Sequence, residues 1–333
     1  MLLIIATTMI LFYGKVLLIP LAFGMLFAFL LNPIHDRLVN WGVHKYIAAI
    51  LSTLIIFLFV LILLGTLGWQ IRELAEQSSQ IKKELIEMQK QIQQLIKNWF
   101  GINFSNQEEY AKNAVDGMKT NVLTFLGGAV GIISQFLISL VYTILLLAER
   151  TRIYKFFHRI FQHEEKADST VEDVSQVTRK YLIGKMMMIG FLAVVYSIGF
   201  YFIGIKYSIL IAVLSAFLTF IPFVGNLVGG AIAVLITLAT GGSNTEIMLI
   251  VIVMSVGQIV ESYILQPWIV GDNVDLNPLT SIFMVIAFSL VWGAAGSVLA
   301  MPLSGMLKVL FDHLKPYQPL GFLMGTGKKE ESS

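Results

Sequence analysis

The sequence predicts an all-α polytopic membrane protein with about eight transmembrane helices. Three observations carry this prediction: 56% of the residues are hydrophobic, only 13% are charged, and apolar runs of about 20 residues recur along the chain. Only helices and closed barrels satisfy their own backbone hydrogen bonds inside a bilayer, and runs of this length are typical of helices. The expected spans cover approximately 1–13, 16–31, 47–69, 122–148, 187–204, 208–240, 247–268 and 280–307.

Two of these apolar runs have ambiguous ends. The first run is separated from the second only by Gly14 and Lys15, and the run 208–240 is too long for one straight span. Pro222 lacks a backbone donor and obstructs the preceding turn, and Gly225 follows it, so we expect a broken helix at Pro222–Gly225. The broken segment could cross the membrane once or fold back as a hairpin.

The polar segments between the runs divide the chain further. A heptad pattern from Leu74 to Trp99 indicates helices in the first long loop, which could pack against each other or against a second subunit. The distribution of Lys and Arg favours cytoplasmic termini. The expected parts are three first spans (1–69), an extracytoplasmic helical loop (70–121), a fourth span (122–148), a cytoplasmic helical element (149–186), a C-terminal membrane region with the transport site (187–314) and a flexible cytoplasmic tail (315–333).

Composition and missing motifs argue against several function classes. The net charge is +2, and no basic cluster with interleaved aromatic residues indicates a nucleic-acid partner. The chain has no cysteine, which excludes disulfides and thiolate chemistry. It also lacks a phosphate-binding loop, a histidine pair at metal-ligand spacing and a Gly-x-Ser-x-Gly nucleophile motif. We therefore expect no enzyme, no cofactor and no metal site.

The first candidate site is Glu261, a carboxylate well inside the apolar segment Gly190–Gly305. A charge in hydrocarbon costs a few kcal/mol, so such residues mark a transport path, a proton relay or a paired structural site. Polar residues at helical spacing accompany it and predict an inward-facing stripe: Ser255, Gln258, Ser262 and Gln266. Glu261 could serve transport, or it could pair with Lys206 or Lys185 as a structural tie.

The second candidate site is the helix break, with Pro222, Gly225, Asn226 and Gly229. Broken helices often build substrate sites in secondary transporters, because their freed carbonyls and amides supply ligands. A simple kink with a small-residue packing face at Gly225 and Gly229 is the alternative. The loop that follows the Glu261 stripe contributes Pro267, Gly271, Asp272, Asp275 and Pro278.

These segments resemble the signature regions of the AI-2E family of membrane proteins, the autoinducer-2 exporter or PerM-like proteins. The resemblance rests on the break Ile221–Asn226, the segment Glu261–Leu279 and the segment Tyr181–Lys185 before the fifth span. It covers nearly the whole chain. Two residues depart from the family pattern: Asn226 stands where the family commonly has Pro, and Lys185 where it commonly has Gln.

The resemblance implies a multi-pass protein of the bacterial inner membrane. It also implies that the protein forms homo-oligomers, which could be pentamers. The family contains exporters of a small polar signalling molecule and sodium- or lithium-proton antiporters. Our first hypothesis is an exporter of a small polar solute, with the break and the Glu261 stripe facing one cavity. The alternative is an antiporter in which Glu261 binds a monovalent cation and a proton in turn. A third hypothesis is a scaffold that acts through the loop 70–121. Membrane lipids are the remaining expected partners.

Overall fold

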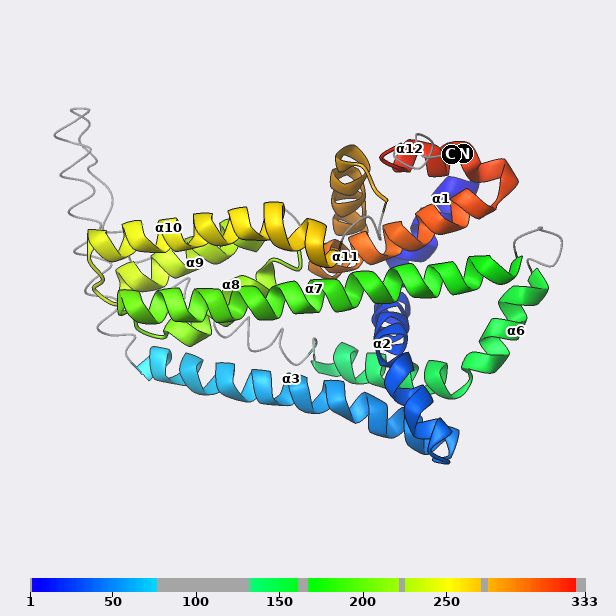
Figure 1. The fold of residues 1–333 in the computed structure, drawn as a ribbon, viewed down its shortest axis with the longest axis horizontal. Helices are drawn as coiled ribbons and strands as arrows, with labels where there is room; N and C mark the ends of the chain where they lie inside the picture. The colour runs from blue at the N-terminus through cyan, green and yellow to red at the C-terminus, as the bar shows by residue number, and fades with distance from the viewer. Residues whose placement is uncertain are drawn as a thin grey trace. The chain divides into compact units, whose positions relative to one another are not determined.

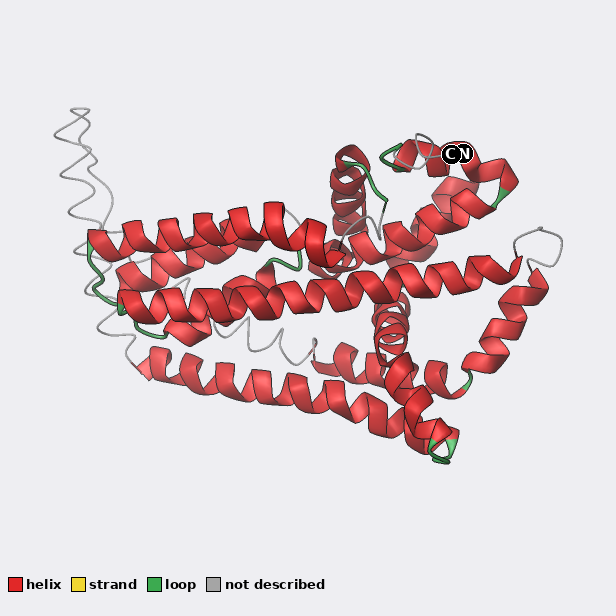
Figure 2. Ribbon diagram, viewed as in Figure 1, coloured by secondary structure: helices red, strands yellow, loops and turns green. Residues whose placement is uncertain are grey.

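The computed structural model describes residues 2–76, 131, 133–160, 167–221, 225–270 and 275–327. The regular elements of these residues are all helices (Figures 1 and 2), which confirms the predicted all-α class. They are α1 (Leu2–Tyr13), α2 (Lys15–Asn40), α3 (Lys45–Glu76), the helix Ile133–Ala148, α6 (Arg150–Ile160), α7 (Ala167–Ile203), α8 (Ser208–Leu218), α9 (Gly225–Ala239), α10 (Asn244–Val260), a π-helix (Glu261–Val270), α11 (Pro278–His313), a 3₁₀ turn (Lys315–Tyr317) and α12 (Gln318–Met324).

Five helices of the described residues are long and apolar enough to cross a membrane: Lys15–Asn40, Lys45–Ile62, Glu172–Ile203, Asn244–Gln266 and Pro278–His313. A sixth is added if Ile133–Ala148 and Arg150–Phe156, bent by 73°, form one broken span. The expected count of about eight is not confirmed. The helices α1, α8 and α9 have 12, 11 and 15 residues. At about 1.5 Å per residue, each is shorter than the roughly 30 Å of a hydrocarbon core.

The expected break in the run 208–240 is present, and the chain turns back on itself there. Helix α8 ends at Leu218 and α9 begins at Gly225, while Pro222 lies outside the described residues. The hydroxyl of Ser215 in α8 donates to the carbonyl oxygen of Gly229 in α9 at 3.1 Å. The two helices therefore form a packed hairpin, which decides between the two arrangements that the sequence left open.

The described residues belong to two compact units. The first unit comprises Met1–Val60, Ser134–Met188 and Ser262–Ser333, and the second comprises Leu61–Ile133 and Ile189–Glu261. Helix α7 runs without interruption through the boundary that the sequence suggested between a cytoplasmic element and the fifth span. Most of the heptad loop lies outside the described residues, so its packing stays a prediction.

In the first unit, the polar start of α3 is tied to the corner between Ile133–Ala148 and α6. The ammonium of Lys45 pairs with Glu149 Oε1 at 3.2 Å, and the phenol of Tyr46 donates to the same oxygen at 2.7 Å. Glu149 is the residue between the two helices. A charged carboxylate therefore stabilises the corner.

Replacing Tyr46 with phenylalanine is expected to raise the pKa of Glu149. The hydrogen bond from Tyr46 is the largest cause that holds this pKa below its ordinary value, followed by the bond from Lys45. A depressed carboxyl pKa stabilises the fold above the unfolded-state pKa, and that stability is lost as the pH falls through the folded-state pKa. The melting temperatures of wild type and Y46F in detergent should thus converge on acidification. A difference independent of pH would assign Tyr46 a packing role alone.

The segment after α11 is held against the residues that precede α11. The amide of Asn277 donates to the carbonyl oxygens of Leu323 and Gly325, at 2.7 and 3.0 Å. The backbone amide of Thr326 donates to Asp275 Oδ1 at 2.9 Å. The sequence assigned 315–333 to a flexible tail, whereas its described part, 315–327, contains a 3₁₀ turn and α12. Its order comes from partners about 50 residues earlier, which the composition of the tail does not reveal.

Candidate functional site

Four polar side chains of the second unit form one hydrogen-bonded cluster. The phenol of Tyr196 in α7 donates to Asn226 Oδ1 at 2.9 Å. The amide of Asn226, in the first turn of α9, donates to Glu261 Oε2 at 3.0 Å and also to Gln258 Oε1. Glu261 lies where α10 ends and the π-helix begins. We call Tyr196, Asn226, Gln258 and Glu261 the polar cluster. Three separate helical segments meet in it.

The hairpin brings Asn226 into the polar cluster. Gly225 opens α9, and a Cβ atom at this position would lie 2.1 Å from the carbonyl oxygen of Leu218, the last residue of α8. Such a distance is impossible for a side chain, so only glycine permits this close return. Asn226 follows directly, and its amide is thereby placed within reach of α10.

Close packing of α7 on α10 places Tyr196. Gly257 has no side chain, and a Cβ atom there would lie 2.3 Å from Tyr196 Cε1 and 2.6 Å from its hydroxyl oxygen. The ring of Tyr196 is fully buried and stacks on Phe200, one turn further along α7, at 6.0 Å between centroids. A buried tyrosine hydroxyl needs a partner, and Asn226 supplies it.

Exposure increases across the polar cluster. Tyr196 is 0% and Glu261 8% exposed, Asn226 is half-buried and Gln258 is exposed. Exposed polar groups on a membrane-spanning helix face protein or a watery cavity, because hydrocarbon leaves them without partners. The cluster thus has a closed end at Tyr196 and an accessible end at Gln258. Ser255, one turn earlier on α10, is exposed as well.

The sequence predicted Gln258, Glu261 and Asn226 as site residues, and the structure brings these three together. Gly225 and Gly229 contribute packing: Gly225 allows the return of α9, and Gly229 contacts Ser215 of α8. Ser262 and Gln266 follow in the π-helix, with Ser262 half-buried and Gln266 exposed.

The residues of the expected loop after the stripe belong to the other compact unit. Asp275 pairs with Lys308 of α11 at 3.7 Å and accepts from Thr326, and Pro278 is the first residue of α11. Lys308 is buried and also pairs with Asp312. These contacts give Asp275 a structural role at the start of α11. Pro222, Gly271 and Asp272 lie outside the described residues, as does the side chain of Pro267.

Tyr196 is the member of the polar cluster that sequence reasoning missed. The sequence gives only a weak indication of its role: the hydroxyl of a tyrosine in the middle of an apolar run needs a hydrogen-bond partner. Tyrosine belongs to the hydrophobic residues of the composition, so Tyr196 does not stand out from the apolar run around it. Pairing Tyr196 with Asn226 requires knowledge that α7 and α9 are neighbours, which the sequence does not supply.

The π-helix begins at Glu261 and runs to Val270. π-helices are rare and occur frequently at functional sites. Pro267 lies within it and has no amide hydrogen to donate. The chain continues through this residue as a wider helix to Val270. Within the described residues, no group of three His, Cys, Asp or Glu side chains could hold a metal ion.

The fold and the recurrent apolar helices define a multi-pass helical membrane protein. Residues 1–315 match the AI-2E family transporter profile, and the chain belongs to the AI-2E family of transporters. The resemblance inferred from the break and the Glu261–Leu279 segment is thereby confirmed.

The chain is similar to relatives that carry transport names. It is 22% identical to the AI-2 transport protein TqsA of Escherichia coli (strain K12), over 96% of this chain and 92% of that protein. It is 22% identical to protein YrrI of Bacillus subtilis (strain 168), over 90% of this chain and 87% of that protein. Protein YueF of the same strain is 23% identical over 89% of this chain and 83% of that protein.

Proposed function

We propose that this chain is a secondary transporter that exports a small polar solute across the bacterial inner membrane, with the polar cluster as part of its binding site. The observation that carries the proposal is the bonding of Glu261 to Asn226 beside Tyr196 and Gln258, at a helix break within apolar spans. A carboxylate, two side-chain amides and a phenol offer both donors and acceptors. That set suits a solute rich in hydroxyl groups.

Autoinducer-2 is the solute to test first, because one relative is named for its transport. Glu261 and the amide oxygens can accept hydrogen bonds from hydroxyl groups, and the amide of Asn226 can donate to a carbonyl or ether oxygen. A solute in this site would replace hydrogen bonds within the polar cluster by hydrogen bonds to itself. No polar group of the cluster is then left unpaired, which keeps the desolvation cost low. The network already formed between the four side chains supports such an exchange.

The hairpin supports the transport reading in a second way. Helices α8 and α9 are too short to cross the bilayer, and Asn226 lies just after their turn. Discontinuous helices that end near the midplane are a common site architecture in secondary transporters. A shift of the hairpin relative to α10 would break the bonds from Asn226 to Glu261 and Gln258 together. We propose this as the step that opens the site.

Glu261→Gln is expected to lower autoinducer-2 flux at least tenfold in proteoliposomes that contain the purified full chain. The amide keeps the size of the side chain but loses the charge and one acceptor, and a charged hydrogen bond contributes about 1.5–3 kcal/mol. Glu246→Gln is the matched control, because Glu246 lies in the first turn of α10, the helix that ends next to Glu261, and outside the polar cluster. Its flux should equal that of the wild type.

The same proteoliposomes separate the exporter from the antiporter. A pH gradient that drives sodium or lithium flux through the wild type, together with loss of that flux in Glu261→Gln and no autoinducer-2 flux, would replace the exporter by the antiporter. Unchanged solute flux in Glu261→Gln would remove Glu261 from the mechanism. Equal losses in Glu246→Gln and Glu261→Gln would indicate a general defect and contradict a specific role.

A further inference from the structure

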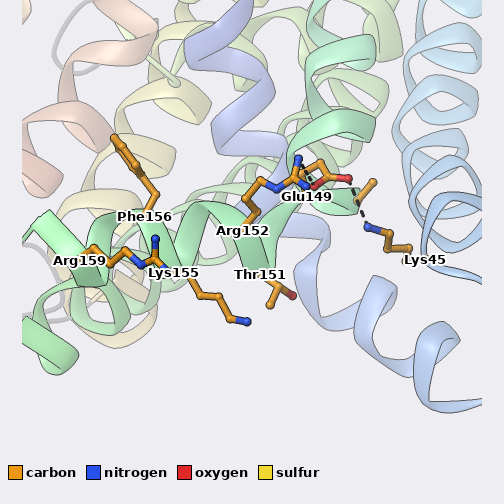
Figure 3. A pocket seen from close by; sticks show the side chains of 8 residues that line it. Lys45, Glu149, Thr151, Arg152, Lys155, Phe156 and Arg159 are labelled. Carbon is orange, nitrogen blue, oxygen red and sulfur yellow. Dashed lines mark hydrogen bonds and ion pairs between the residues drawn. The ribbon is translucent and has the colours of Figure 1, made fainter.

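A basic pocket lies in the first unit, at the corner where α6 leaves the helix Ile133–Ala148 (Figure 3). It has a volume of about 500 Å³. This size falls in the range of pockets that hold small molecules or headgroups. Its lining consists of Lys45, Ala148, Glu149, Thr151, Arg152, Lys155, Phe156 and Arg159. We call these residues the corner pocket.

The corner pocket has an excess of positive charge. Four cationic side chains face one carboxylate, Glu149. Lys45 and Arg152 lie 3.2 and 3.5 Å from the oxygens of that carboxylate and are partly neutralised by it. Lys155 and Arg159 form no ion pair within the part of the chain that the structure describes. Two cations are therefore available for an anion.

The position of α6 favours a ligand at the membrane surface. The apolar helix Ile133–Ala148 has the composition of a span, and Arg150–Phe156 turns away from it by 73°. A segment bent this far from a membrane-crossing helix runs close to the bilayer plane. Basic residues alternate in α6 with Ile153 and the exposed Phe156, a pattern typical of interfacial helices.

Rigid contacts fix the corner, so the pocket is preformed. Arg150 donates to Asn32 Oδ1 of α2 at 2.6 Å and pairs with Asp36 of the same helix. Tyr46 of α3 donates to Glu149 at 2.7 Å. In Figure 3 the basic side chains of the pocket extend from α6, while Lys45 approaches Glu149 from the start of α3. A preformed pocket loses less conformational freedom when a ligand binds.

We propose that the corner pocket binds the phosphate headgroup of an anionic phospholipid. The guanidinium of Arg159 and the ammonium of Lys155 would donate to the phosphate oxygens, with Phe156 beside the start of the acyl chain. An anionic leaflet attracts Lys and Arg near its surface. Lipid headgroups lie at the same depth as an interfacial helix, so they are always close to this pocket. A free anion would have to reach the pocket from solution. This site is independent of the proposed transport site, which belongs to the other unit.

Native mass spectrometry of the purified full chain with phosphatidylglycerol or phosphatidylcholine tests the proposal. The wild type should retain phosphatidylglycerol in preference to phosphatidylcholine. The double variant Lys155→Gln/Arg159→Gln should bind phosphatidylglycerol roughly 25-fold more weakly, at about fivefold for each charge removed near a membrane surface. The double variant Lys180→Gln/Lys315→Gln removes the same charge from outside the pocket and should keep wild-type affinity.

A charge-conserving variant separates lipid binding from misfolding. Lys155→Arg/Arg159→Lys keeps both cations and should keep phosphatidylglycerol binding. Equal affinity for the two lipids, or equal losses in the pocket variant and the control variant, would overturn the proposal. Binding of inorganic phosphate that depends on Lys155 and Arg159, without any preference for phosphatidylglycerol, would assign the pocket to a soluble anion and would also overturn it.

Discussion

Gly225→Ala is expected to abolish transport and to lower the stability of the protein by about 3 kcal/mol, the upper end of the usual cost of overpacking. The added Cβ atom would lie 2.1 Å from the carbonyl oxygen of Leu218 and 2.3 Å from Thr219 Cα. Both are backbone atoms, so no rotamer change can relieve the contact. The start of α9 must move away from α8, and Asn226 moves with it. Melting in detergent and flux in proteoliposomes would record the two effects.

Gly230→Ala is the control for this experiment. Gly230 lies in the same helix, and a Cβ atom there would meet only Met254, at 3.7 Å or more. That is ordinary contact, and alanine favours the helix over glycine by about 1 kcal/mol. We expect unchanged or slightly higher stability and normal flux. A Gly225→Ala variant as stable and active as Gly230→Ala would show that α9 does not need its close return onto α8.

Gly257→Ala is expected to have the second largest effect, a loss of about 2 kcal/mol of stability together with most of the transport activity. Its Cβ atom would lie 2.3 Å from the ring of Tyr196, and this ring is fully buried. The ring must shift, and its hydrogen bond to Asn226 breaks. Because that bond helps to hold the amide of Asn226, the contact with Glu261 weakens as well. Flux assays and melting in detergent measure the loss.

Two further variants test whether the effect of Gly257→Ala acts through Tyr196. Gly190→Ala places a Cβ atom on α7 where nothing lies within 4 Å, so it should be neutral. In a Tyr196→Ala background the alanine at position 257 has room, so its cost should largely disappear, as expected for residues in contact. Additive losses in the double variant would show that Gly257 acts on something other than the tyrosine ring.

The fold class and the break could be predicted because they depend on local sequence. Long apolar runs require helices in a membrane, and the Pro222–Gly225 pattern interrupts a helix wherever it lies. The number of spans could not be predicted in the same way. Whether the run 208–240 crosses or folds back depends on contacts between residues on opposite sides of the break, such as the one between Ser215 and Gly229. Composition is the same in both arrangements.

The residues of the candidate site also differ in whether they could be predicted from local sequence. Glu261 was predicted as a carboxylate inside an apolar segment, Gln258 from its helical spacing, and Asn226 from its place beside a helix break. Tyr196 was missed because only the close packing at Gly257 places it next to Asn226. Asp275 was predicted as part of the loop that follows the Glu261 stripe. Its partner Lys308 lies more than 30 residues further on, and the ion pair gives it a structural role.

The α8–α9 hairpin also determines the sidedness of the helices that follow it. Because neither α8 nor α9 is long enough to cross the bilayer, the chain returns after α9 to the membrane face at which α7 ends. The next helix, α10, then enters from that same face and runs opposite to α7.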